Sequence, residues 1–146
     1  MFHQKKIRYS LVIAVSILGA AIANATEAYT TSSAWLRTGP DRSFPTIMRV
    51  QRSSTVDVIG CTSGYRWCDV DVNGERGWLQ SNQLQMVYNG RRGSLSRLGP
   101  LMDLMILQFS FGDYWDNHYR SRPWYNDQNR QRWQNWQPNM SPFHNR

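Results

Sequence analysis

The two cysteines, Cys61 and Cys68, are the residues whose chemistry the sequence defines most closely. Six residues separate them, a spacing that suits a cross-link between the arms of a hairpin and differs from a CxxC redox pair. A zinc site needs about four ligands at suitable spacing, and His118 and His144 lie far downstream. Export from the cytosol would favour oxidation of the pair. We therefore predict a structural disulfide and no metal site.

Asp69 and Asp71 stand two residues apart on an expected strand, so their carboxylates should share one face. Paired carboxylates can hydrolyse glycosides, but that chemistry requires a cleft between them. We interpret this pair as a solvated strand face balanced by Arg66 and Arg76. Histidine does not occur between residues 26 and 87, so no imidazole is available there as a general base. The sequence predicts no catalytic residue, no cofactor and no enzymatic activity.

The first 25 residues have the pattern of a cleavable export signal. Three basic residues precede an apolar run at 11–23, and Ala23-Asn24-Ala25 is a small-x-small cleavage pattern. Cleavage after Ala25 would leave Thr26 as the mature N-terminus. A retained membrane anchor is the alternative, but a spanning helix needs about 20 apolar residues. We expect a periplasmic or secreted protein with no transmembrane segment after cleavage.

Short segments separated by turn residues predict a mainly β domain over residues 26–87. Val56 and Val58 share one face of the segment 55–61, as in a half-buried strand. Asn73-Gly74 favours a tight hairpin, because both residues tolerate positive φ. About five short strands in some 60 residues indicate a small barrel.

The order of several motifs resembles the bacterial SH3-like family. The matching pieces are Ala34-Trp35-Leu36-Arg37-Thr38-Gly39-Pro40, Phe44-Pro45, Gly60-Cys61, Tyr65-Arg66-Trp67-Cys68-Asp69-Val70, Asn73-Gly74 and Arg76-Gly77-Trp78-Leu79. Trp35 stands where that family usually has asparagine. The resemblance implies an SH3-like β-barrel that acts outside the cytoplasm and binds peptidoglycan or its peptides.

Five residues of the barrel are candidates for ligand contact. Small SH3-like barrels bind extended ligands in shallow aromatic grooves. Tyr65, in a turn, is the aromatic residue that we expect to be most exposed, and Trp67 is close to it in sequence. The resemblance implies that Trp78 is more often a core residue. Arg37 and Asp41 flank the long loop that would border such a groove.

The region after the barrel is basic and aromatic. Residues 88–146 contain eight arginines and four acidic residues, whereas the charges of residues 26–87 balance. We predict a C-terminal extension, 88–125, with a strand near 104–111 and a short helix near 113–120. The segment 126–146 is rich in Asn, Gln, Arg and Pro and is predicted to be disordered.

Three interpretations of this extension remain open. It could cover an edge or a face of the barrel, which we favour for residues 101–125. It could contact an anionic envelope surface, since arginine and aromatic side chains suit such interfaces. Single-stranded nucleic acid also suits this composition, but export argues against that partner. The candidate contact residues are Trp115, Tyr119, Arg120, Arg122 and Trp124.

Taken together, these features predict a non-catalytic binding module that acts outside the cytoplasm. Its expected ligand is peptidoglycan or another component of the cell envelope. The alternative is a periplasmic adaptor whose partner is an envelope protein, bound through the barrel groove or the aromatic extension.

Overall fold

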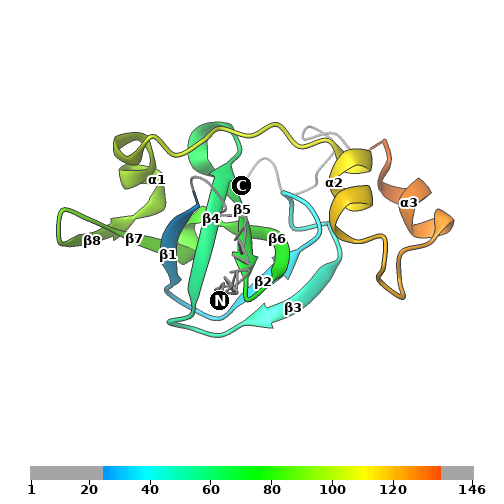
Figure 1. The fold of residues 1–146 in the computed structure, drawn as a ribbon, viewed down its shortest axis with the longest axis horizontal. Coiled ribbons are helices and arrows are strands. Elements are labelled where there is room, and N and C mark those ends of the chain that lie inside the picture. Colours follow the sequence, from blue (N-terminus) through cyan, green and yellow to red (C-terminus); the bar gives the residue numbers. More distant parts are fainter. Residues whose placement is uncertain (1–24, 136–146) are drawn as a thin grey trace, which may run out of the picture.

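A computed structural model describes residues 25–135 of the chain (Figure 1). Residues 1–24 of the predicted export signal, 1–25, lie outside the described residues, and Ala25 is the first residue described. No helix within residues 25–135 is long and apolar enough to cross a membrane. The first strand begins at Thr26.

The main structural element is one antiparallel sheet of eight strands in the order β3-β2-β6-β5-β4-β1-β7-β8. The strands are β1 (Thr26–Thr30), β2 (Ala34–Arg37), β3 (Thr46–Val50), β4 (Thr55–Cys61), β5 (Trp67–Val72), β6 (Glu75–Gln80), β7 (Leu84–Tyr88) and β8 (Arg91–Ser94). The expectation of a mainly β, SH3-like fold is confirmed. The sheet has more strands than expected, and it continues to Ser94 instead of ending near residue 87.

Alternation of side chains across the pleat explains which face of the sheet is apolar. Along β4, Val56 and Val58 are buried and Asp57 is exposed. The inward-facing residues of the strands form one cluster with Leu95 and Leu98 from the segment after β8. This cluster is the inner core of the domain.

Two tight turns use the same Asn-Gly pair. Asn73 and Gly74 have φ values of 52° and 88° in the turn between β5 and β6. Asn89 and Gly90, between β7 and β8, have φ values of 49° and 73°. Positive φ at both central residues is what a type I′ hairpin requires. The first hairpin was expected from the sequence, and the second follows from the same signal.

The predicted disulfide between Cys61 and Cys68 is confirmed. The two residues are directly opposite each other on β4 and β5, with their Cα atoms 4.0 Å apart. Both side chains are fully buried in the inner core. The bond therefore ties the two central strands together at the end of their hairpin.

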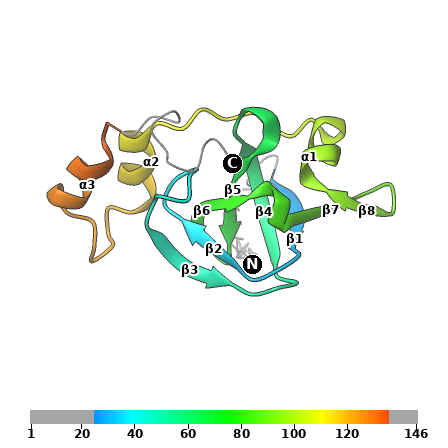
Figure 2. The ribbon, with the colours of Figure 1, turned by 180° about the vertical axis from the view of Figure 1, so that it is seen from behind.

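Helical segments lie at the two ends of the molecule and in two of its connections (Figures 1 and 2). The two short connections are η1 (Ser63–Tyr65) and η2 (Ser81–Gln83). The end next to β7 and β8 holds α1 (Leu95–Leu98), which is followed by η3 (Gly99–Met102). The opposite end holds α2 (Phe111–His118) and α3 (Asp127–Trp133).

The structure corrects three expectations for the extension. Residues 104–111 form no strand, and their single bridge joins Ile106 to Cys61. The helix expected near 113–120 begins and ends two residues earlier. Residues 127–133, expected to be disordered, form α3, whereas 136–146 lie outside the described residues.

A close approach to Gly60 explains how the 104–111 segment is held without a strand. A Cβ atom at Gly60 would lie 2.7 Å from Leu107 Cγ and 2.8 Å from the Met105 carbonyl oxygen. The Leu107 N–H donates to the Cys61 carbonyl at 2.7 Å, and the Cys61 N–H donates to the Met105 carbonyl at 2.8 Å. The segment 104–111 is therefore held against the sheet by this crossing instead of by strand pairing.

Candidate functional site

The outer face of β5 and β6 carries Asp69 and Trp78, which are cross-strand neighbours. Helix α2 covers this face. The Trp115 Nε1–H donates to the Thr38 carbonyl at 3.0 Å, and the Tyr119 hydroxyl donates to the Arg76 carbonyl at 3.0 Å. Two buried side chains of the extension thus donate hydrogen bonds to backbone carbonyl groups of the barrel.

The rings around α2 form an aromatic cluster. Its fully buried and partly buried members are Phe44, Ile47, Phe109, Phe111, Tyr114, Trp115, Tyr119, Trp124, Tyr125 and Trp133. The ring of Trp78 adjoins it, with centroids 5.6 Å from Phe109 and 5.5 Å from Tyr114. Each such contact contributes roughly 0.5–1.5 kcal/mol beyond the area that it buries. The extension therefore packs on the barrel as a second, outer core.

A charged network lies beneath α2. Asp69, which is only 4% exposed, accepts hydrogen bonds from Arg76 Nε at 3.2 Å and Arg76 Nη2 at 2.5 Å. The Tyr114 hydroxyl donates to the same carboxylate at 2.7 Å. Burial raises the pKa of Tyr114 far above its ordinary value, so this hydroxyl stays protonated and remains a donor.

This network corrects the interpretation of Asp69 as part of a solvated strand face. Its carboxylate is enclosed by a helix that lies 45 residues further along the chain. Asp71 accepts a hydrogen bond from the Gly74 N–H at 2.7 Å and so supports the hairpin turn. The two aspartates have separate structural contacts.

Further ion pairs hold the chain around α2. Arg122 pairs with Glu75 of β6, and this hydrogen bond raises the pKa of the guanidinium. Asp116 accepts from the Tyr125 hydroxyl and lies 3.0 Å from Arg130. Both partners lower the pKa of Asp116, the tyrosine hydrogen bond more strongly.

The candidate contact residues of the extension therefore differ in how far the fold engages them. Trp115 and Tyr119 are fully buried, which corrects their assignment to an exposed contact surface. Trp124 is half-buried against both of them, and Arg122 is engaged with Glu75. Arg120 is the exposed member, with 73% of its side chain accessible.

Three of the barrel candidates are also engaged in the fold. Trp78 is 1% exposed, so the structure corrects its assignment as a ligand contact. Asp41 is buried and accepts hydrogen bonds from the backbone and hydroxyl of Ser43. Arg37 donates to the Phe44 carbonyl at 2.9 Å. Arg37 and Asp41 thus organise the loop between β2 and β3.

Tyr65 and Trp67 are half-buried, and the extension contacts the first of them. The Tyr65 hydroxyl donates to the Leu104 carbonyl at 3.4 Å, and its ring lies 2.7 Å from where a Cβ on Gly99 would stand. One side of the Tyr65 ring is therefore covered by the chain after α1. The role of these two residues in ligand contact stays a prediction.

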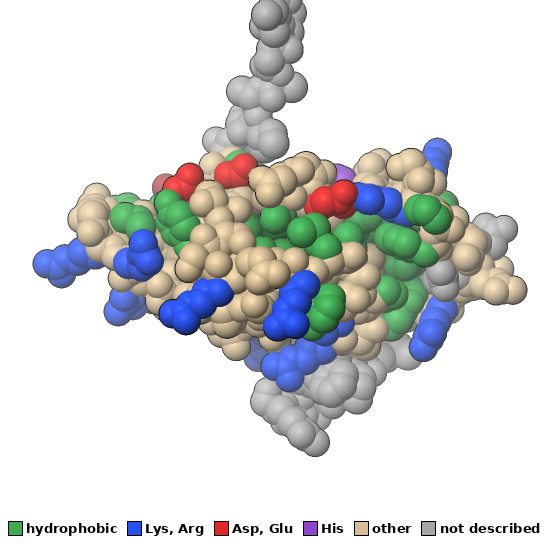
Figure 3. Space-filling view, turned by 90° about the horizontal axis from the view of Figure 1, so that it is seen from below, with side chains coloured by type: hydrophobic (Ala, Val, Ile, Leu, Met, Phe, Trp, Pro, Cys, Tyr) green, Lys and Arg blue, Asp and Glu red, His purple; other side chains and the backbone are tan. Residues whose placement is uncertain are grey.

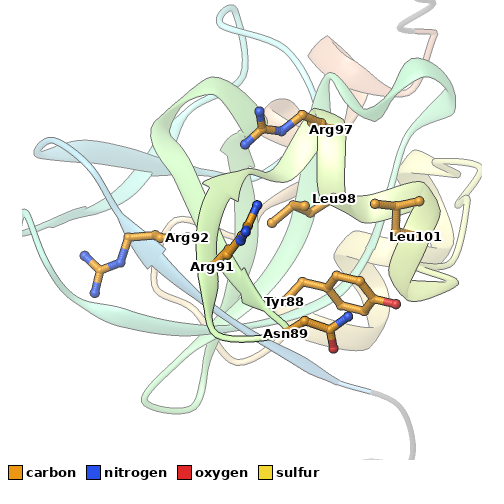
Figure 4. Close-up of a pocket in the computed structure, with 7 residues that line it drawn as sticks. All are labelled: Tyr88, Asn89, Arg91, Arg92, Arg97, Leu98 and Leu101. Atoms are coloured by element: carbon orange, nitrogen blue, oxygen red, sulfur yellow. The ribbon is translucent and has the colours of Figure 1, made fainter.

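An open hollow of about 490 Å³ lies between the β7–β8 hairpin and the α1–η3 segment (Figure 4). It is lined by Tyr88, Asn89, Arg91, Arg92, Arg97, Leu98 and Leu101. Figure 4 shows Arg91 directed toward α1 and Arg92 directed to the other side of β8. This hollow was not predicted from the sequence, although Asn89-Gly90 is a hairpin signal that could have located it.

The arginines of the hollow differ from those beside α2. The ion pairs among the described side chains use Arg76, Arg120, Arg122 and Arg130, and none of them uses an arginine of the hollow. Arg92 lies over the Tyr29 ring, 5.5 Å from its centroid. The space-filling view shows basic side chains spread over one face, with acidic ones near its upper edge (Figure 3).

Trp35 forms a second exposed feature. Its ring is 48% exposed on β2, and Arg49, its cross-strand neighbour on β3, lies 5.7 Å from the ring centroid. This position is the one where the sequence departs from the expected asparagine. The pair provides an exposed aromatic surface with a cation beside it.

Residues 32–85 match the family described as the bacterial SH3 domain. The matched segment includes β2 to β6, the disulfide and the Asn73-Gly74 hairpin. Residues 32–85 form a bacterial SH3 domain. The β8 strand, the hollow and both C-terminal helices lie beyond this match.

A solved structure entitled "Structure of NlpC2 from Trichomonas vaginalis" is similar to this chain at 17% identity, with a TM-score of 0.41. The similarity covers 48% of this chain and 26% of that one, so the chain spans about a quarter of that protein's length. No curated protein matches the sequence. Within residues 25–135, no three His, Cys, Asp or Glu side chains are grouped to hold a metal.

The SH3 domain and its extension share the outer face of the sheet. Asp69, Arg76 and Trp78 belong to the SH3 domain, and Tyr114, Trp115 and Tyr119 belong to the extension. The surface left accessible includes the hollow and the Trp35–Arg49 pair, the first outside the domain and the second inside it.

Proposed function

We propose that the protein is a non-catalytic binding module of the cell envelope that recognises peptidoglycan or another envelope component outside the cytoplasm. The bacterial SH3 domain at residues 32–85 is the observation that carries this proposal. The buried disulfide between Cys61 and Cys68 supports it, because disulfides persist in oxidising compartments. The export signal expected at residues 1–25 is consistent with that location.

The contacts of the buried groups under α2 support a binding role over a catalytic one. Asp69 is held by Arg76 and Tyr114, and burial raises the pKa of Tyr114. A general acid or base needs reach to a substrate and a pKa near the working pH. These groups are buried under α2, where their hydrogen bond joins the extension to the domain.

Co-sedimentation with purified sacculi tests the proposal directly. We expect protein purified after secretion to sediment with sacculi at about 0.15 M salt, where exposed charges are screened beyond about 8 Å. A protein of similar size and net charge that lacks an SH3 domain is the control. Absence of sedimentation at every salt concentration would contradict recognition of peptidoglycan.

A periplasmic adaptor is the second candidate. Leu101, Met105 and Ile106, on the chain between the two ends of the molecule, are 59%, 51% and 49% exposed. Exposed apolar side chains of this kind can contact a protein partner. Cross-linking in intact cells followed by mass spectrometry would test this, with cross-links from residues near 101–106 to one envelope protein as the expected result.

A further inference from the structure

The hollow between the β7–β8 hairpin and the α1–η3 segment has the composition of a binding site for an anionic ligand. Arg91 lines it from β8 and Arg97 from α1, and Asn89 adds a side-chain amide. Arginine offers planar, forked donors that match carboxylate and phosphate groups. Among the side chains that the structure describes, no carboxylate forms an ion pair with either arginine.

The hollow also has an apolar part. Tyr88 on the hairpin and Leu98 and Leu101 on the facing segment line it, and Leu101 is 59% exposed. A volume of about 490 Å³ falls in the range of small-ligand sites, roughly 300–1,000 Å³. The chemistry therefore suits a group that carries negative charge beside an apolar side chain.

The placement of Arg97 depends on Gly93. A Cβ atom on Gly93 would lie 2.6 Å from Arg97 Nη2 and 3.0 Å from Leu98 Cδ1. The bare backbone of β8 lets Arg97 lie across the strand, on the face that Arg91 also occupies two residues before Gly93. Both guanidinium groups are thereby brought to the same side of the hairpin.

The hairpin is poorly suited to lie on a lipid surface. Tyr88 pairs with Arg91 and Val87 pairs with Arg92, so these two apolar side chains point to opposite faces. A segment that lies on a membrane places its apolar groups on one face. The hollow is concave, which suits a peptide-sized group better than a flat bilayer.

We propose that this hollow binds a carboxylate-bearing peptide, with Arg91 and Arg97 holding carboxylate groups while an adjoining apolar side chain contacts Tyr88 and Leu101. The inference rests on the proposed envelope function, because peptidoglycan peptides carry free carboxylates. It also adds to that function, since the hollow consists of residues beyond the bacterial SH3 domain.

Titration of the isotope-labelled protein with two small peptides tests the inference by NMR. The acidic probe is acetyl-alanyl-glutamate, and the neutral control is acetyl-alanyl-glutamine amide. We expect the acidic probe to shift the Gly90 and Gly93 amides and the Nε–H groups of Arg91 and Arg97 saturably. Equal shifts with both probes, or no shift in the hairpin, would overturn the inference.

Charge variants show which arginines hold the probe. The double variant Arg91→Gln/Arg97→Gln should weaken binding of the acidic probe by about tenfold or more, as expected for charge-assisted hydrogen bonds. Arg52→Gln removes one positive charge from an exposed turn outside the hollow and should leave the affinity unchanged. Arg91→Lys/Arg97→Lys keeps the charge but loses the fork, so undiminished affinity in that variant would contradict paired recognition.

Two further measurements separate the possible failures. Vesicles of equal parts phosphatidylglycerol and phosphatidylcholine should not shift the hairpin signals, and shifts with vesicles but not with the peptide would overturn the peptide assignment. If sacculi bind the wild type and the Arg91→Gln/Arg97→Gln variant equally, the hollow is ruled out as the binding site, and the proposed function stands. If the acidic peptide binds the hollow but sacculi do not bind, the hollow stands and peptidoglycan recognition fails.

Discussion

At the end of the molecule formed by α2 and α3, Arg122 and Arg130 each lie against a carboxylate, whereas Arg91 and Arg97 at the β7–β8 end line an open hollow. The paired arginines lie beside buried aromatic rings and help to attach the extension to the sheet. Arg91 and Arg97 form no ion pair with the described carboxylates and line the hollow together with exposed apolar residues such as Leu101. The same residue type thus has a structural role at one end and remains available for binding at the other.

The difference follows from which groups the sequence places nearby. Asp116 on α2 and Glu75 on β6 supply carboxylates around the first set of arginines. The segment 88–101 contains three arginines and no acidic residue. A basic composition alone therefore does not identify a binding surface, because ion pairs within the fold use part of the charge.

Removing the central ring of the α2 end should have the largest effect. Trp115 is fully buried, and its indole N–H donates to Thr38. We expect Trp115→Ala to lower the free energy of unfolding by about 3 to 5 kcal/mol, as for other large-to-small core changes. Tyr88→Ala at the hairpin end is the matched control and should cost much less, because that ring is 36% exposed. If urea unfolding shows that both variants lose the same free energy of unfolding, the two ends do not differ in the way proposed.

Neutralising the buried carboxylate should have the next largest effect. Asp69→Asn keeps the shape but leaves Arg76 without its charged partner, and Arg76 is 26% exposed. Water at that side chain reduces the loss, so we expect about 2 kcal/mol in denaturant unfolding. Asp57→Asn, on an exposed position of the neighbouring strand, should change stability by less than about 0.5 kcal/mol. If Asp69→Asn leaves the free energy of unfolding unchanged, the network does not contribute to stability.

Alkaline pH should weaken the α2 end through its buried tyrosines. Burial raises the pKa of Tyr114 and of Tyr119 far above the ordinary value of 10.0. Their contribution is complete below the unfolded pKa and declines as pH rises above about 10, where only the unfolded chain ionises. The expected slope is roughly 1.4 kcal/mol per pH unit for each group. Tyr114→Phe should reduce this slope, and an unchanged slope would show that Tyr114 does not cause it.

Single arginine changes should give the smallest effects. Arg122 and Glu75 are each about one third exposed, so Arg122→Gln should cost no more than about 1 kcal/mol. Arg91→Gln should leave the midpoint of thermal unfolding unchanged, because no ion pair within residues 25–135 is lost. A larger loss for Arg91→Gln than for Arg122→Gln would reverse the roles assigned to the two ends.

The sequence was sufficient to predict features that depend on local patterns. The disulfide and the Asn73-Gly74 hairpin follow from spacing and turn chemistry, and the SH3-like fold follows from the order of the motifs. The burial of Asp69 could not be predicted in this way. Alternation along β5 places its carboxylate on the outer face, where Tyr114, far along the chain, contacts it.

The extension was harder to predict because its contacts are long-range. Residues 104–111 alternate like a strand, yet their bridge to the sheet joins only Ile106 to Cys61, beside the point where Leu107 crosses Gly60. The aromatic residues of α2 suit a buried layer and an exposed surface equally well by composition. Their hydrogen bonds to Thr38 and Arg76 show that they form the buried layer.

The most direct test compares sacculus binding by two variants with the same change of charge. Arg91→Gln/Arg97→Gln alters the hollow, and Arg120→Gln/Arg122→Gln alters the α2 end. We expect the first variant to keep its stability and to lose most of its sedimentation with sacculi at about 0.15 M salt. The second should sediment as the wild type does. Loss of sedimentation in the second variant alone would place binding on the aromatic extension and contradict the roles proposed for the two ends.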